Sequence, residues 1–195
     1  ATYMDGTTDI TRTYPLGELT EDERRFYTWT LQCHIDIAKA VWLDYCECKM
    51  IDTIAREPLW RHLINYRCGT GHSVSFVGNV HEGPHALNGR NTTLMRPGMI
   101  VTDEPGVYET DLVGIRIENE LVCVHKADNQ YGTFLGFEPI MFVPIATSPI
   151  VPGVLTQDEI DWLNNYHRQV FEKLAPRLNE GERDWLAKKC AAIGC

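Results

Sequence analysis

The sequence has little that would suit a membrane or a nucleic acid. Its longest apolar stretches, such as residues 140–146, are interrupted by Pro144, and they fall far short of the roughly 20 apolar residues that a membrane-spanning helix needs. Acidic residues outnumber basic ones 27 to 18, the formal net charge is −9, and no Lys/Arg cluster could follow a phosphate backbone. Neither a membrane nor a nucleic acid is expected as a partner.

The sequence also lacks the marks of a secreted protein. Its first residues have neither the basic start nor the apolar run of a signal peptide. The seven cysteines are odd in number and irregularly spaced, unlike a disulfide framework. Cys46 and Cys48 form a single C-x-C pair, whereas structural zinc sites usually need a second pair or added histidines. These absences favour a reduced, cytoplasmic chain and weigh against a zinc ribbon.

The composition and the helix signals indicate a globular chain. Its 195 residues, 44% of them hydrophobic, are enough for a substantial packed core. Thr-x-x-Glu capping boxes at residues 20–23 and 156–159 predict the starts of two amphipathic helices. Pro58 is expected to bend or split another helix. The four expected helices cover, approximately, residues 20–41, 49–65, 156–174 and 181–192.

The middle of the chain has the texture of a sheet. From Arg67 to about residue 146, Gly and Pro separate short segments rich in Val, Ile, Tyr and Phe. Residues 5–12 alternate Thr and Ile and are also expected to form a strand, from which Asp9 would project. The further expected strands are residues 99–102, 114–119, 120–124 and 137–146.

Four acidic or imidazole residues lie in short, strongly patterned motifs. Asp9 lies in DGTTDITRT, His72 in GTGHSVSF, Glu104 in TDEPG and Glu118 in GIRIENE. Carboxylate oxygens suit hard divalent cations, and one imidazole brings manganese, iron, cobalt or zinc into range. A bridging carboxylate can hold two metals about 3.5–4 Å apart, so that both polarise one water. The four residues therefore predict most of a dinuclear metal site.

The context of these residues supports a site, although each one taken alone would more often be a solvent-facing side chain. In the Ile-Arg-Ile-Glu alternation, Arg116 and Glu118 would share one face of a strand. Glu104 ends an apolar strand, where a side chain can project into a cleft. The glycines of residues 69–71 are expected to let the backbone bend so that His72 faces the metals.

The ordered set DGTTDITRT, GTGH, NVHEGP, TDEPG and GIRIEN resembles the catalytic domain of the pita-bread metallopeptidases, within them the aminopeptidase P (Xaa-Pro aminopeptidase) branch. The resemblance continues through LTQDEIDWLNNYH and spans almost the whole chain. It implies an α+β, pita-bread (creatinase/aminopeptidase-like) fold, in which helices flank a curved antiparallel sheet and the metal cleft lies on the concave side. Residues 1–195 would then be a single catalytic domain without its N-terminal part.

The resemblance assigns the metal ligands residue by residue. Asp9 and Glu118 correspond to the carboxylates that bridge two metals, and His72 and Glu104 to ligands of one metal. Relatives carry a further aspartate ligand eleven residues before the one matched by Asp9, a place upstream of Ala1. One tight and one weak divalent metal position are therefore expected, with manganese as the expected metal and zinc, cobalt or iron as alternatives.

The resemblance also assigns catalytic roles. His81 in NVHEGP corresponds to a histidine that contacts the substrate near the scissile bond; without the resemblance it would be a hydrogen-bonding loop residue. Glu104 is a candidate for shuttling the proton of the attacking water, and Arg116 resembles an arginine that orients the metal ligands. Cys68 stands where several relatives have a histidine, and we expect it to be a buried structural cysteine rather than a pocket-lining thiol.

The reaction implied is metal-dependent hydrolysis of the bond between an N-terminal residue and a following proline, with activity expected to be impaired in this chain. Two alternatives stay open. One is a catalytically inert pita-bread module that binds peptides or proteins, and the other is a prolidase that acts on Xaa-Pro dipeptides. The expected partner is a peptide with proline at the second position, and a homodimer is compatible with the sequence.

Overall fold

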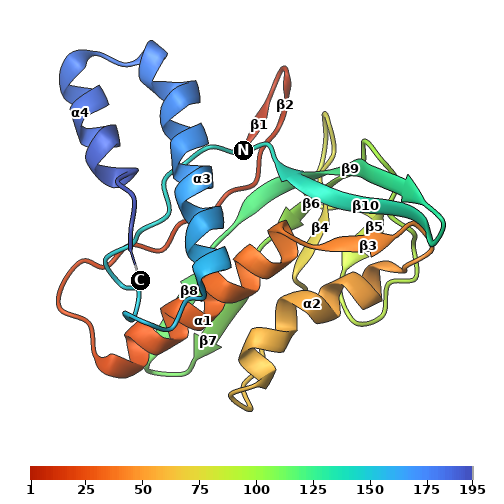
Figure 1. Cartoon of the computed structure of the whole chain (residues 1–195), viewed down its shortest axis with the longest axis horizontal. Helices are drawn as coiled ribbons and strands as arrows, with labels where there is room; N and C mark the ends of the chain where they lie inside the picture. Colours follow the sequence, from red (N-terminus) through yellow and green to blue (C-terminus); the bar gives the residue numbers. More distant parts are fainter. Residues whose placement is uncertain (195) are drawn as a thin grey trace.

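The computed structural model, which describes residues 1–194, is built around a six-stranded antiparallel sheet with helices against one face (Figure 1). The strand order is β3-β10-β9-β6-β4-β5. These strands are β3 (Val41–Leu43), β4 (Gly71–Ser73), β5 (Glu82–Leu87), β6 (Ile100–Asp103), β9 (Asn119–Asn129) and β10 (Gly132–Pro139). Two further two-stranded sheets pair β1 (Thr2–Tyr3) with β2 (Gly6–Thr7) and β7 (Gly106–Glu109) with β8 (Val113–Arg116). The mixture confirms the α+β prediction.

The helices are α1 (Glu21–Ala38), α2 (Cys48–Trp60), α3 (Gln157–Leu174) and α4 (Glu180–Lys189), with a short 3-10 turn at Ala175–Arg177. Both predicted capping boxes form, at Thr20 for α1 and at Thr156 for α3. Helix α2 contains Pro58 but ends two residues later, at Trp60. The proline therefore lies in the last turn, and the expected splitting of a longer helix does not occur.

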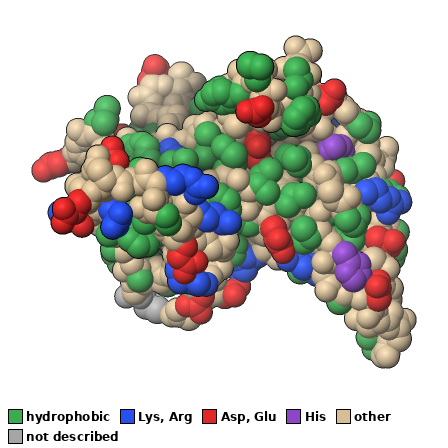
Figure 2. Space-filling view, turned by 90° about the horizontal axis from the view of Figure 1, so that it is seen from above, with side chains coloured by type: hydrophobic (Ala, Val, Ile, Leu, Met, Phe, Trp, Pro, Cys, Tyr) green, Lys and Arg blue, Asp and Glu red, His purple; other side chains and the backbone are tan. Residues whose placement is uncertain are grey.

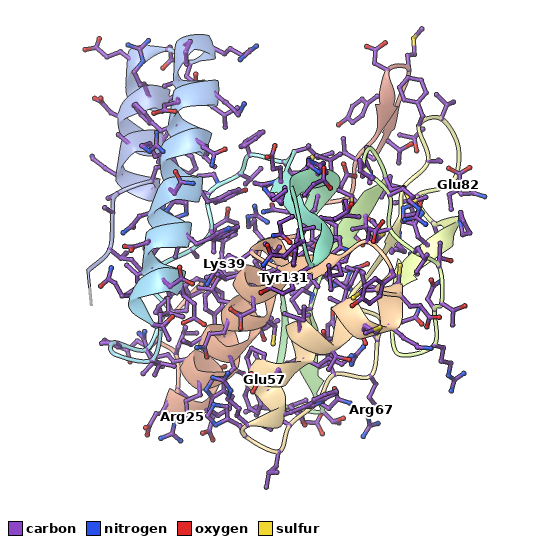
Figure 3. The ribbon with its side chains drawn as sticks, turned by 45° about the vertical axis from the view of Figure 1, so that its right-hand side comes forward. Arg25, Lys39, Glu57, Arg67, Glu82 and Tyr131 are labelled. Carbon is purple, nitrogen blue, oxygen red and sulfur yellow. The ribbon has the colours of Figure 1, made fainter. Side chains whose placement is uncertain are left out.

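Helices α1 and α2 pack against the sheet through one apolar core. Ile37 from α1 and Ile51 from α2 are almost fully buried, together with Leu121 of β9 and Leu135 of β10. A second core lies between α1 and α3, where Leu31 and Leu163 are fully buried. At the end of α1, Lys39 forms an ion pair with Asp158 of α3, and Figure 3 labels Lys39 at this junction. The helices thus fill one face of the sheet.

Two of the predicted strands have different bounds. Strand β10 ends at Pro139, so most of the expected strand at residues 137–146 is irregular. In this irregular segment a side chain takes the place of a neighbouring strand, because Arg12 donates to the carbonyl oxygens of Val143 and Pro144. Strand β8 ends at Arg116, and Glu118 lies outside any strand. The expectation that these two residues share a strand face was therefore wrong.

The surface of the described chain carries charges of both signs. Figure 2 shows acidic and basic side chains interspersed on one face of the molecule, without a basic patch on that face. Within residues 1–194, no helix is both long enough and apolar enough to cross a membrane.

Candidate metal centre

Successive side chains of strand β6 point alternately toward the core and toward the candidate site. Val101 is fully buried in the core under the helices, and Oδ2 of Asp103 lies 3.0 Å from Nδ1 of His34 in α1. Because successive side chains of a strand point to opposite faces, Thr102 and Glu104 project away from the helices. Glu104 follows the last residue of β6, which confirms that it ends an apolar strand.

The start of β9 follows the same rule. Nδ2 of Asn119 lies 3.3 Å from Nε2 of His34, so Asn119 points toward α1. Its strand neighbour Glu120 therefore points to the opposite face. There, Oε1 of Glu120 accepts a hydrogen bond from the backbone N–H of Asp9 at 2.7 Å. Two segments far apart in the sequence thus meet on the face that the helices leave free.

Asp9 lies in an extended segment after β2, and not in a strand as predicted. The segment runs beside residues 116–118, because the N–H of Glu118 donates to the carbonyl of Thr11 at 3.1 Å. At the next step the hydroxyl of Thr13 replaces a backbone partner, bonding the carbonyl and the N–H of Arg116 at 2.9 and 3.1 Å. A side chain in the ladder interrupts regular pairing, yet the segment still places Asp9 beside the other predicted ligands.

Three of the four predicted ligands are in direct contact. Nε2 of His72 lies 3.1 Å from Oε1 of Glu104 and 3.5 Å from Oδ2 of Asp9. Burial acts to lower the pKa of His72, but the hydrogen bond and charge of Glu104 and the charge of Asp9 raise it. Burial likewise acts to raise the pKa of Glu104, and its contacts with His72 outweigh this and lower it. The imidazole thus occupies the position of a cation among carboxylates.

Glu118, the fourth predicted ligand, is fully buried. Its Oε2 accepts a hydrogen bond from the hydroxyl of Thr11, whereas its Oε1 has no hydrogen-bond partner among residues 1–194. Burial raises the pKa of Glu118 to about 7; the Thr11 hydrogen bond opposes the rise, and the charges of Glu104 and Asp9 add to it. An unpaired buried carboxylate oxygen is costly, and a bound cation would satisfy both the bare oxygen and the crowded negative charge.

The four side chains do not form a preformed cage. Within the described residues, no group of three or more His, Cys, Asp or Glu side chains is arranged so that it could already hold a metal ion. The reason is that the donors bond to one another, as Nε2 of His72 does with Glu104. They fit a divalent metal by donor chemistry, by proximity and by the bare oxygen of Glu118. Binding would have to replace the contact between His72 and Glu104.

The predicted catalytic residues lie beside this cluster. His81 is exposed just before β5, and its ring centroid lies 4.0 Å from that of His72. Figure 3 labels the following residue, Glu82, on the side of the molecule that carries the β1–β2 hairpin. Nη1 of Arg116 lies 3.4 Å from Oε2 of Glu104, and its Nε donates to the hydroxyl of Tyr108 at 2.8 Å. Both side chains are therefore within reach of a molecule bound at the cluster.

Gly71 and Cys68 both lie close to the site. Gly71 allows close packing, because a Cβ at this position would lie 1.7 Å from the carbonyl oxygen of Thr102. Cys68 is half-buried, packs against a small apolar cluster and directs its thiol to the carbonyl oxygen of Gly106 at 3.7 Å. It borders a cavity of about 190 Å³ whose lining includes none of the predicted ligands, so its structural role stays a prediction. All six cysteines within residues 1–194 are free.

The sequence reasoning missed a polar network behind the site. Nη2 of Arg12 donates to Oδ1 of Asn119 at 2.7 Å and to the hydroxyl of Tyr166 at 2.9 Å. Asn119 in turn contacts His34, which faces Asp103 at an ion-pair distance, although neither carboxylate oxygen of Asp103 has an aligned hydrogen-bond donor in the described part of the chain. The one available signal was position, since Asp103 and Asn119 each directly adjoin a predicted ligand.

The sequence matches known metallopeptidases along nearly its whole length. Residues 1–125 match metallopeptidase family M24, and residues 133–193 match the C-terminal region of that family. Aminopeptidase P1 of Lotus japonicus is 42% identical, over 100% of this chain and 30% of its own length. Aminopeptidase P2 of Arabidopsis thaliana is 45% identical, over 95% of this chain and 27% of its own length. The chain therefore spans less than a third of these relatives.

Solved structures show the same relationship. An X-prolyl aminopeptidase from Caenorhabditis elegans, described as a cytosolic enzyme with a di-nuclear active site, superposes with a TM-score of 0.91 and 37% identity, over 98% of this chain and 32% of its own. A prolidase from Pyrococcus furiosus superposes with a TM-score of 0.60 and 27% identity, over 70% of this chain and 37% of its own. These likenesses confirm the pita-bread fold and the resemblance to aminopeptidase P. The chain belongs to metallopeptidase family M24.

Proposed function

We propose that this chain carries the metal-binding residues of an Xaa-Pro aminopeptidase, which hydrolyses the bond between an N-terminal residue and a following proline. The observation that carries the proposal is the bare, fully buried carboxylate oxygen of Glu118 beside a cluster of Asp9, His72 and Glu104. The names of the aminopeptidase P relatives support the substrate class. Because the chain spans less than a third of those relatives, the activity of a whole protein is part of the proposal.

The residues offer donors for a divalent metal centre. Asp9, His72, Glu104 and Glu118 are the residues that would hold the divalent cations, with His72 as the one nitrogen donor among three carboxylates. Manganese is the proposed metal, and the same mixed set of oxygen and nitrogen donors would accept zinc, cobalt or iron. When bound, such cations supply Lewis acidity that activates water and polarises the scissile carbonyl.

The remaining roles fall to side chains of this chain. Glu104 lies in the cluster beside His72, and it is the proposed acceptor of a proton from the attacking water. His81 is exposed next to His72, and its proposed role is to donate a hydrogen bond to the oxyanion. Arg116 contacts the other oxygen of Glu104 and holds that carboxylate in orientation. The substrate bond ends on a proline nitrogen without an N–H, so catalysis cannot depend on that donor.

The proposal is tested by loading the chain with manganese, measuring its metal content, and offering two tripeptides that differ only in having proline or alanine second. We expect binding of one or more metal ions per chain, and release of the first residue from the proline peptide only. The Glu118→Gln variant should lose metal and cleavage together. Metal content below about one per chain, without cleavage of the proline peptide, would refute the proposal and favour the inert binding module.

A prolidase is the second candidate, favoured by the structural likeness to the Pyrococcus furiosus prolidase. The two enzymes differ in the length of substrate that they accept. Cleavage of an Xaa-Pro dipeptide, without cleavage of the tripeptide, would identify a prolidase.

We also propose that residues 1–195 act as a single domain and that the protein is cytoplasmic. The location is supported by the free cysteines within residues 1–194 and by the description of the Caenorhabditis elegans relative as a cytosolic enzyme. A homodimer stays a prediction, which sedimentation or light scattering of the purified chain would test.

A further inference from the structure

We infer that Asp52 of helix α2 is a positioning residue for the metal centre: through Thr70, it fixes the segment that carries His72 and the backbone of Glu104. The inference rests on the proposed metal site, because it concerns how two of its ligands are held. Asp52 lies on the helical side of the sheet, outside the ligand cluster. Its influence would therefore act through the backbone and not through contact with a metal or a substrate.

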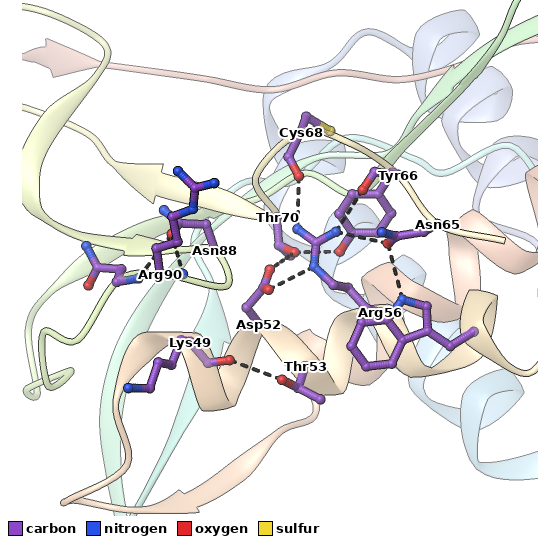
Figure 4. Close-up of polar contacts among 12 residues, drawn as sticks. Lys49, Asp52, Thr53, Arg56, Asn65, Tyr66, Cys68, Thr70, Asn88 and Arg90 are labelled. Carbon is purple, nitrogen blue, oxygen red and sulfur yellow. Dashed lines mark hydrogen bonds and ion pairs between the residues drawn. The ribbon is translucent and has the colours of Figure 1, made fainter. Parts of the chain in front are cut away.

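The carboxylate of Asp52 is divided between two partners (Figure 4). Its Oδ1 accepts a hydrogen bond from the hydroxyl of Thr70, and its Oδ2 lies 2.8 Å from Nε of Arg56. The hydroxyl of Tyr66 also bonds the hydroxyl of Thr70. Asp52 is 1% exposed and Thr70 is 0% exposed, so water cannot replace a lost partner. Removing any one of these groups would leave a buried polar atom unpaired.

Arg56 extends the anchor along the backbone that leads to Thr70. Its guanidinium donates to the carbonyl oxygens of Tyr66 and Cys68 at 2.8 and 2.9 Å and to Oδ1 of Asn65 at 3.1 Å. The same guanidinium lies 4.1 Å from the centroid of the Tyr66 ring. A buried cation that binds several acceptors in fixed directions leaves the segment at residues 65–68 little freedom. The segment therefore enters β4 in one position.

Thr70 passes this constraint to both ligands. Its carbonyl accepts the backbone N–H of Glu104 at 2.7 Å. On the other side, Gly71 packs so closely that no Cβ fits against the carbonyl of Thr102. The hydroxyl of Thr102 accepts the N–H of His72 at 2.9 Å and donates to Oε1 of Glu104 at 3.0 Å. Movement of Thr70 would thus move the histidine ligand and the carboxylate ligand together.

A second acid-base pair on the same helix offers a matched control. Glu57 and Arg61 have the same four-residue spacing as Asp52 and Arg56, and their ion pair measures 2.6 Å. Their side chains are 46% and 65% exposed, against 2% and 11% for Asp52 and Arg56. Figure 3 labels Glu57 on α2, well away from the end of the molecule that carries Glu82. The exposed pair stabilises only the helix, so its loss should leave the ligands in place.

The experiment compares Thr70→Val, Thr70→Ser, Asp52→Asn and Glu57→Gln in the full chain. Manganese affinity is measured by titration with detection of free Mn²⁺ by electron paramagnetic resonance. Amide hydrogen exchange is followed at Glu104 without metal. Loss of a group that orients ligands typically weakens metal binding by about 10–100-fold. We expect that loss, together with faster exchange at Glu104, for Thr70→Val and Asp52→Asn.

The controls distinguish positioning from general damage to the fold. Thr70→Ser keeps the hydroxyl and Glu57→Gln removes only the exposed pair, so both should retain wild-type affinity and exchange. Circular dichroism identifies any variant that does not fold. If either Thr70→Val or Asp52→Asn fails to fold, the other of these two variants tests the inference. Wild-type affinity and slow exchange at Glu104 in the folded Thr70→Val or Asp52→Asn variant would overturn the inference. A wild-type chain that binds no manganese would overturn the proposed function, while the exchange at Glu104 would still decide the positioning role.

Discussion

Replacing Gly71 by alanine gives the sharpest test of how the ligand strands are packed. A Cβ at residue 71 would lie 1.7 Å from the carbonyl oxygen of Thr102 and 2.7 Å from its carbonyl carbon. Both are backbone atoms, so no side-chain rotation can relieve the overlap. To restore an ordinary contact of 3.4 Å, the backbone at Gly71 and Thr102 would have to separate by about 1.7 Å. The two hydrogen bonds beside this contact would be lengthened and weakened by that movement.

The cost follows from the contacts that separate. Forcing an extra methyl group into a closely packed position typically costs about 1–3 kcal/mol. The bonds from His72 N–H to the hydroxyl of Thr102 and from Glu104 N–H to the carbonyl of Thr70 would weaken as well, and each contributes about 1 kcal/mol. We expect Gly71→Ala to lower the free energy of unfolding by about 3 kcal/mol, and the Tm by roughly 6–12 °C for a chain of this size.

The assay combines urea and thermal denaturation with a manganese titration. Gly69→Ala is the matched control, because its Cβ would lie 3.4 Å from the carbonyl of Leu87, an ordinary contact. The control should stay within about 1 kcal/mol of the wild type and keep its metal affinity, whereas Gly71→Ala should lose both stability and affinity. Equal stability and equal manganese affinity of the two variants would show that the strand packing around residue 71 does not hold the ligands.

Three further predictions concern pH, the core and catalysis. Burial raises the pKa of Asp36 from its ordinary 3.8 to about 6, so the native state holds the extra proton and stability falls as pH rises between these values. Asp36→Asn should therefore raise the free energy of unfolding by about 1 kcal/mol at pH 7.5, after allowance for partial exposure. This advantage should disappear near pH 4. An equal gain at both pH values, or the same gain in the exposed control Asp184→Asn, would contradict the raised pKa of Asp36. Leu121→Ala, at a fully buried position, should cost about 2–5 kcal/mol in urea denaturation, whereas Leu16→Ala, at a fully exposed position, should change little. His81→Ala should lower kcat for the proline tripeptide by about 10²-fold or more while leaving manganese affinity close to wild type; a parallel loss of metal would make His81 a ligand.

The helix starts were predictable because their signals are local. In each capping box a threonine and a glutamate three residues later satisfy one another's backbone groups, and the structure reproduces both pairs. Strand β4 gave no comparable signal, since it spans only Gly71–Ser73. Its position depends on the bond from His72 to Thr102 and on the pairing of Gly71 with Leu87, both far along the chain. A short strand held by distant partners carries too little periodicity to be identified from its own residues.

The apolar run at residues 140–146 shows why an apolar pattern does not by itself identify a paired strand. The run packs against the core through residues such as Ile145, which is 1% exposed. Its backbone is satisfied by Arg12, by the hydroxyl of Tyr166, which bonds the N–H of Val143, and by His167, which accepts the N–H of Ile145. An apolar run in the sequence indicates that its side chains can pack against a core. It does not report whether a neighbouring strand or a polar side chain completes the hydrogen bonds.

In the candidate metal site, the candidate donor residues were also predictable from the sequence, whereas their burial and hydrogen bonding were not. Its donors could be identified because carboxylates and an imidazole in ordered motifs limit the chemistry, whatever the geometry. What could not be predicted is that Glu118 would be fully buried with one bare oxygen, while Glu104 and His72 satisfy each other. Those states depend on Thr11 and Thr102, whose hydroxyls select which carboxylate oxygen is occupied. The two threonines therefore influence which carboxylate oxygens stay available to a cation. A motif that contains only the candidate ligands does not include these contacts.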